Sequence, residues 1–210
     1  MENTDLKRRI LEISFKNKLS HLGSCLTAVD IIDDIFSLKK PDEKFVLSNG
    51  HAGLALYVVL EKYLGVNAEE VFNHHGVHPD RCGKCHIDCS SGSLGNGLPI
   101  AVGMALADKN KNVSCLISDG ECAEGSVSEA LRIGEEQSLE NLEVYLNFNG
   151  FGAYKEIDKQ RLLEQLSFIH SFTLWFRETN MNEYPNWLQG QEAHYKVMNE
   201  EEYKQAMEIL

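Results

Sequence analysis

Apolar residues recur along the chain in blocks with either helical or strand spacing. Near the start, Leu6, Ile10 and Ile13 share one helical face, which predicts a helix over residues 5–16. The same reasoning predicts helices over residues 27–36, 52–64, 99–109, 123–137, 159–168 and 200–209. Short apolar runs that end in polar or glycine residues predict strands over residues 45–48, 113–118, 142–148 and 171–177.

This alternation of strands and helices is typical of the α/β class. It predicts a parallel sheet with helices on both faces. Residues 73–92, rich in His, Cys, Gly and Asp, are predicted to form a loop. Ligands of such sheets bind at the carboxyl ends of the strands, and Asp119 and Asn149 both follow a predicted strand. The sequence therefore predicts a site at that edge.

Charge and composition narrow the function classes. The chain of 210 residues has 20 Lys and Arg against 32 acidic residues, a net charge of −12 that argues against binding nucleic acid. No apolar run approaches the ~20 residues of a membrane span, and the polar, acidic start is unlike a secretory signal. Six cysteines in such a chain are expected as thiols or metal ligands. These features predict a cytoplasmic protein.

Asp119 and Asn149 combine two oxygen donors suited to a metal. A carboxylate and an amide oxygen from neighbouring parallel strands are suitable ligands for Mg²⁺, which also takes phosphate oxygens. Gly120 would let the backbone approach a diphosphate closely. Taken singly, Asp-Gly and Asn-Gly after a strand are more often simple turns.

Ordered segments around these residues resemble the amino-terminal domain of transketolases, in register over most of residues 6–155. The segments are Ser20-His21-Leu22-Gly23, residues 45–52, Val77-His78-Pro79, residues 91–98, residues 101–105, Asp119-Gly120-Glu121, Glu124-Gly125 and Asn149. The resemblance implies a thiamine diphosphate-binding domain of α/β fold.

The resemblance also implies a cofactor site. Asp119, Asn149 and the backbone carbonyl of Phe151 would be the ligands of Mg²⁺ or Ca²⁺. The further residues implied at the cofactor are Gly120 and His51 near the diphosphate, Gly92 and Leu94 near the rings, and Glu121.

Histidines are the catalytic residues that the resemblance implies. His21, His51 and His78 each lie inside a matching segment and would bind the cofactor and sugar hydroxyls and move protons. His194, near the end of the chain, would be a fourth. Glu124 would reach across an interface toward a partner's catalytic glutamate.

The chain departs from the family in places. Ser118 and Ser20 stand where glycines are usual, and the segment from about residue 155 is shorter than in relatives. Residues 1–210 are expected to form a single diphosphate-binding domain, with no counterpart of the pyrimidine-binding domain. We therefore expect a separate partner subunit that carries that domain, in an α2β2 assembly, and a sugar or sugar phosphate substrate.

A cysteine motif lies outside the resemblance. Cys82, Cys85 and Cys89 have the ligand type and spacing of a zinc knuckle, with His86, His74 or His75 as a fourth ligand. A structural zinc site usually draws on two such pairs, so free thiols are the default expectation.

Three functions remain open at this point. The histidine set favours transfer of a two-carbon ketol unit from a ketose to an aldose by a transketolase-type enzyme. A synthase that uses a 2-oxo acid could have the same half-site. A non-catalytic paralogue that binds the cofactor is the third alternative, against which the intact Asp119, Asn149, Glu124 and histidines argue.

Overall fold

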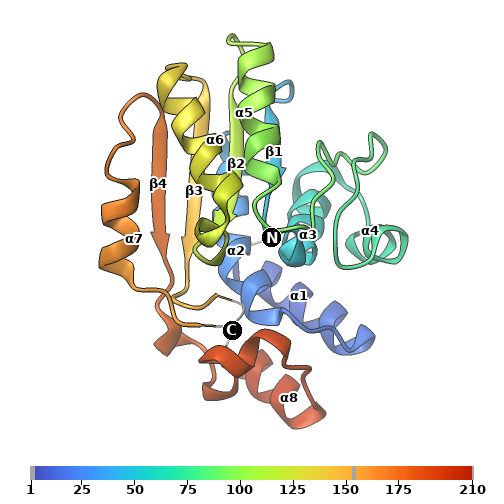
Figure 1. Ribbon diagram of the computed structural model, residues 1–210. Coiled ribbons are helices and arrows are strands. Elements are labelled where there is room, and N and C mark those ends of the chain that lie inside the picture. Colours follow the sequence, from blue (N-terminus) through green and yellow to red (C-terminus); the bar gives the residue numbers. More distant parts are fainter. Residues whose placement is uncertain (1–2, 153–154, 210) are drawn as a thin grey trace.

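Four parallel strands form one sheet within the residues that the computed structural model describes, 3–152 and 155–209 (Figure 1). The strands lie in the order of the sequence: β1 (Lys44–Leu47), β2 (Val113–Ser118), β3 (Leu142–Phe148) and β4 (Thr173–Glu178). Because all four run in the same direction, their carboxyl ends meet at one edge of the sheet.

Helices cover both faces of this sheet, as the sequence predicted. On one face, Leu116 and Tyr145 pack in a core with α1 (Asn3–Asn17), α2 (Leu22–Leu38) and α3 (Gly53–Leu64). On the other face, Cys115 and Ile117 pack with α5 (Gly97–Ala107), α6 (Gly125–Glu136) and α7 (Lys159–Leu166). Neighbouring residues of β2 point to opposite faces, and all six of its residues are buried, so the strand is covered on both sides. The parallel-sheet α/β fold is thus confirmed.

Several predicted boundaries shift. The helix predicted from residue 27 begins at Leu22, and the one predicted over 123–137 follows a short 3₁₀ turn at Gly120–Ala123. The region predicted as loop begins with the end of another helix, α4 (Ala68–His75). Asn67 caps α4 by accepting hydrogen bonds from the N–H groups of Glu69 and Glu70, a signal that the sequence contained.

Helix α5 is only partly covered by the rest of the protein. Its residues are apolar all round, yet Ile100 and Leu106 are 41% and 39% exposed because the sheet and α6 cover one side of it. Within the described residues, none of the helices has the length and apolarity needed to cross a membrane.

The carboxyl-terminal segment folds back on the first helix (Figure 1). It runs through three short 3₁₀ turns (Met181–Glu183, Asn186–Leu188 and Gln191–Tyr195) into α8 (Glu200–Ile209). The ring of Tyr203 in α8 stacks on Phe15 in α1 with centroids 4.4 Å apart, and Ala206 is fully buried in the same core. Both ends of the chain therefore contribute to one core.

The start of α5 approaches the end of β1 too closely for a side chain. A Cβ at Gly97 would lie 2.5 Å from the Cα of Ser48, whereas one at Gly103 in the same helix would meet nothing within 4 Å. We predict that Gly97→Ala lowers the free energy of unfolding by about 1–3 kcal/mol through overpacking. Gly103→Ala, the matched control, should raise it by about 0.5–1 kcal/mol through helix propensity. Urea unfolding of both variants measures this, and equal effects would contradict the packing argument.

Candidate functional site

A cavity of about 180 Å³ opens at the carboxyl ends of β1, β2 and β3. Its walls also include the start of α2 and the 3₁₀ turn at Gln191–Tyr195. Ten of the residues predicted for the site line it: His21, His51, His78, Gly92, Leu94, Asp119, Gly120, Asn149, Phe151 and His194. The fold thus gathers segments from the whole length of the chain around one space.

Asp119, directly after β2, is the carboxylate of this cavity. It is 1% exposed, and its oxygens accept hydrogen bonds from the N–H groups of Gly120 (2.9 Å), Asn149 (3.1 Å) and Gly150 (2.8 Å). Burial raises the pKa of Asp119 to about 6, although these N–H groups oppose the rise. A buried carboxylate with a raised pKa has too little compensating positive charge, so a bound cation would stabilise its ionised form.

The loop after β3 carries the second candidate metal ligand, Asn149. Gly150 adopts a left-handed φ of 86°, and the N–H of Phe151 donates to the side-chain oxygen of Asn149 at 3.0 Å. A Cβ at Gly120 would lie 3.2 Å from the Cα of Gly152, so the two loops approach closely. The ends of β2 and β3 therefore lie close together, and Asp119, Asn149 and Phe151 all line the same cavity.

Three histidines from distant segments form a cluster in the cavity. The ring centroids of His21 and His194 are 4.6 Å apart, and His51 lies 5.3 Å from His21 and 5.5 Å from His194. Burial, with the neighbouring histidines as a further cause, lowers the pKa of His21 to about 4 and that of His51 to about 3. Burial also lowers the pKa of His194. These rings are neutral near pH 7, so each offers one N–H donor and one acceptor nitrogen.

His21 is held in a backbone conformation that is rare for a residue with a side chain. It precedes α2 with φ 60° and ψ 21°, the left-handed region, and its N–H donates to the carbonyl of His194 at 3.1 Å. Nδ1 of His21 is buried and has no hydrogen-bond partner among the described residues. Strain of this kind is often found at functional sites, where the surrounding structure enforces it.

His78, Gly92 and Leu94 reach the cavity from the loop between α4 and α5. The N–H of Ser91 donates to the carbonyl of Pro79 at 2.9 Å, which closes this loop beside the cavity. A Cβ at Gly92 would lie 3.2 Å from the ring of His78, so a side chain there would crowd the histidine.

Two asparagines of the cavity were missed by sequence reasoning. Asn49 follows β1 and Asn147 lies in β3, and each is 1% exposed. Neither side-chain polar atom of Asn49, nor Oδ1 of Asn147, has a hydrogen-bond partner among the described residues. The position of both at carboxyl ends of strands was the available signal. Ser24, Ser118, Gly152 and Tyr195 complete the lining.

Glu121 and Glu124, also predicted for the site, lie outside the lining of the cavity. Glu121 is fully buried and accepts hydrogen bonds from the Ser48 hydroxyl (2.7 Å) and from the N–H groups of Gly95 (2.9 Å) and Ser118 (3.0 Å). Its carboxylate therefore joins three loops and faces the protein instead of a ligand. Glu124 is exposed at the start of α6.

The three cysteines predicted as possible zinc ligands, Cys82, Cys85 and Cys89, do not all lie together in the structure. Cys82 and Cys85 lie together with His75, whereas Cys89 is buried elsewhere and its thiol donates to the carbonyl of Ser90.

The polar groups of the cavity fit a metal-bound diphosphate. Buried polar atoms without partners are rare in folded proteins, so the orphaned atoms of His21, Asn49 and Asn147 indicate that a polar ligand belongs there. The Asp119 carboxylate and the Asn149 amide oxygen suit a hard divalent cation, and Gly120 lines the same cavity without a side chain.

Comparison with known proteins agrees with this geometry. A family profile described as "Transketolase, thiamine diphosphate binding domain" matches residues 38–160, more than half of the chain. The chain belongs to this family.

Relatives of this transketolase-family chain include a protein named as one subunit of an enzyme. That protein, from an apulose-4-phosphate transketolase of Phocaeicola vulgatus, is 32% identical over 163 residues, which cover 68% of this chain and 58% of the relative. The transketolase of Homo sapiens is 34% identical over 152 residues, covering 63% of this chain and 24% of the human protein. The matched region thus spans between a quarter and three fifths of these relatives.

Solved structures agree on the fold. A transketolase variant from Pichia stipitis superposes with a TM-score of 0.75 at 20% identity, over 98% of this chain and 40% of that one. Transketolase from Leishmania mexicana gives 0.66 at 18% identity, over 84% of this chain and 36% of that one.

The lowered histidine pKa values predict how stability depends on pH. The unfolded state takes up a proton at His51 below about pH 6.5, whereas the folded state does so only near its own pKa of about 3, so acid favours unfolding. His51→Asn removes this contribution. Between pH 7.5 and about pH 5, the free energy of unfolding of the variant should therefore increase by up to about 2 kcal/mol relative to that of the unmodified chain.

Urea titrations at the two pH values measure this gain. His170→Asn, an exposed histidine outside the cavity, is the control and should show no such gain. An equal pH response in His51→Asn and the unmodified chain would show that His51 titrates normally.

Proposed function

We propose that this chain binds the diphosphate of thiamine diphosphate through Mg²⁺ in the cavity at the strand ends, and that it works as one subunit of a transketolase-type enzyme. The observation that carries the proposal is that Asp119 and Asn149 line the same polar cavity as a cluster of neutral histidines. The family description supports the cofactor, and the histidines support a substrate with several hydroxyl groups.

In this proposal, the metal is held by the Asp119 carboxylate, the Asn149 side-chain oxygen and the backbone carbonyl of Phe151. Mg²⁺ and Ca²⁺ both prefer such oxygen ligands and complete their shells with phosphate oxygens and water. The hydrogen bonds from Gly120, Asn149 and Gly150 keep the carboxylate in place before the metal arrives. Gly120 and His51 line the part proposed for the diphosphate, and Gly92 and Leu94 line the part proposed for the rings.

The cofactor, when bound, supplies the electron sink that ketol transfer requires. The residues of this chain would bind and orient the sugar and move its protons. His21, His51 and His194 are neutral near pH 7, so each can donate a hydrogen bond to one hydroxyl and accept a proton from another. His78, which lies against Gly92 in the cavity wall, extends this set. The substrate class we propose is a ketose donor and an aldose acceptor, as sugars or sugar phosphates.

We further propose that a partner subunit with a pyrimidine-binding domain completes the site in an α2β2 assembly. A relative bears the name of a subunit, and 58% of it aligns with this chain. The exposed carboxylate of Glu124 is available to face such a partner. Six free thiols agree with a cytoplasmic location.

Asp119→Ala is predicted to weaken Mg²⁺-dependent binding of thiamine diphosphate by about 100-fold or more, because it removes a direct metal ligand. Isothermal titration of the assembled enzyme with the cofactor, with and without Mg²⁺, measures the loss. Asp42→Ala removes a carboxylate that is 64% exposed and serves as the control. Unchanged affinity in Asp119→Ala would rule out this metal site.

Ketol transfer is predicted to require the partner. The purified chain should have no turnover with xylulose 5-phosphate and ribose 5-phosphate, a first substrate screen, and activity should appear on addition of the partner that carries the pyrimidine-binding domain. Cofactor binding without turnover in the complex would instead support a non-catalytic role. Turnover by this chain alone would contradict the half-site.

A further inference from the structure

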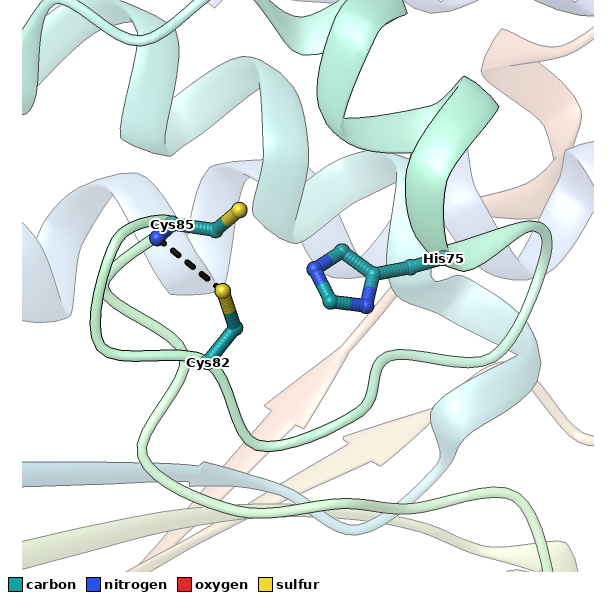
Figure 2. Close-up of side chains that lie close together, drawn as sticks. All are labelled: His75, Cys82 and Cys85. Atoms are coloured by element: carbon teal, nitrogen blue, oxygen red, sulfur yellow. Dashed lines mark hydrogen bonds between the residues drawn. The ribbon is translucent and has the colours of Figure 1, made fainter.

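Away from the cofactor cavity, His75, Cys82 and Cys85 face one another across a short gap (Figure 2). One ligand atom from each residue lies within 4.8 Å of the other two. We propose that these three residues bind a zinc ion that fastens the end of helix α4 to the hairpin formed by residues 82–87.

The hairpin arranges the two cysteines as a chelating pair. Cys82 and Ile87 exchange two backbone hydrogen bonds of 2.9 Å, and His86 turns the chain with a left-handed φ of 57°. The N–H of Cys85 donates to the sulfur of Cys82 at 3.4 Å, the bond drawn in Figure 2. Hydrogen bonds to this sulfur, from the Cys85 thiol and from the N–H groups of Cys85 and Lys84, lower the pKa of Cys82, whereas burial and the neighbouring Cys82 raise the pKa of Cys85 to about 11. The metal itself must therefore displace the proton of Cys85.

His75 supplies a nitrogen ligand from the last turn of α4. Its ring points toward both sulfur atoms (Figure 2), and its buried Nε2 has no hydrogen-bond partner among the described residues. Burial, followed by the neighbouring His74, lowers the pKa of His75, so the ring is neutral and can offer a lone pair. The Tyr57 hydroxyl donates to the carbonyl of Gly76 at 3.2 Å and fixes the backbone next to this ligand.

These ligand types and distances suit zinc. Zinc–sulfur bonds of about 2.3 Å and zinc–nitrogen bonds of about 2.0 Å place the atoms of a tetrahedron about 3.5 to 3.8 Å apart. The observed ligand atoms lie within 4.8 Å of one another, so a closure of at most about 1.3 Å brings them to that geometry. On binding, two thiol protons pass to solvent, two Zn–S bonds and one Zn–N bond form, and the two thiolates balance the charge of the ion. Water or another donor takes the fourth position.

This ligand set differs from the one expected from sequence, in which Cys89 was the third cysteine and free thiols were the default. Cys89 is 7% exposed, packs in the core with α5 and α6, and lies outside the cluster. His86, which turns the hairpin, also lies outside it. His75 takes the place of Cys89 and His86 as the third ligand, because the end of α4 lies next to Cys82 and Cys85.

The position of the zinc would affect the cofactor cavity. His75 and Cys82 lie at the two ends of the segment that contains His78 and Pro79. The carbonyl of Pro79 accepts a hydrogen bond from the N–H of Ser91, the residue before Gly92. A metal that joins the two ends of this segment would limit the movement of His78. This consequence rests on the proposed function, whereas zinc binding itself does not.

Elemental analysis of the full chain, purified without chelator, tests the proposal directly. We expect about one zinc per chain. Cys82→Ser, Cys85→Ser and His75→Asn should each lose most of it, whereas the matched controls Cys89→Ser and His86→Asn should keep it. Replacement of zinc by Co²⁺ should give the visible absorption of a tetrahedral site with thiolate ligands, and Cys85→Ser should abolish that absorption. These readouts need neither thiamine diphosphate nor turnover, so their failure is distinct from a failure of the proposed function.

Other results would overturn the proposal. Absence of zinc, together with rapid alkylation of Cys82 and Cys85 or a disulfide between them, would leave a plain thiol pair. Zinc that survives in His75→Asn but is lost in Cys89→Ser would establish the three-cysteine set in its place.

Discussion

The hydrogen bonds between the Asp119 carboxylate and three backbone N–H groups hold the candidate site together. They join the end of β2 to the loop after β3, so the two strand ends present their oxygens to one cavity. This arrangement buries a carboxylate whose pKa rises to about 6. A metal ion would offset that desolvation, which connects the stability of the folded chain to the ligand that we propose for it.

The contrast between Asp119 and Glu121 explains how one turn can be both rigid and able to bind. Glu121, two residues further on, directs its oxygens to Ser48, Gly95 and Ser118 and so fixes the loops around the cavity. Asn49 and Asn147 instead keep polar atoms without partners among the described residues. Polar groups that are fully hydrogen-bonded within the protein thus surround polar atoms that remain available to a ligand. Such an arrangement preorganises a binding site.

The histidine cluster depends on contacts between the two ends of the chain. His21 stands before α2 in a left-handed conformation, and its N–H is bonded to the carbonyl of His194. His194 is in turn positioned by a terminal segment whose helix α8 stacks Tyr203 on Phe15. Packing far from the cavity therefore determines how closely these rings approach one another.

The sequence by itself determined the class of fold and the strand ends at which the candidate site lies. Apolar runs bounded by Asp-Gly and Asn-Gly located β2 and β3 to the residue, and parallel strands necessarily bring Asp119 and Asn149 to one edge. Local patterns report backbone periodicity, but they do not report which way a side chain turns or which distant segment it meets. Tertiary packing alone directed the side chain of Glu121 into the protein interior and buried Asn49 and Asn147. It also brought His194 next to His21. It also placed His75, and not Cys89, beside Cys82 and Cys85, because the direction of α4 is set by its contacts with α3 and not by the spacing of the cysteines.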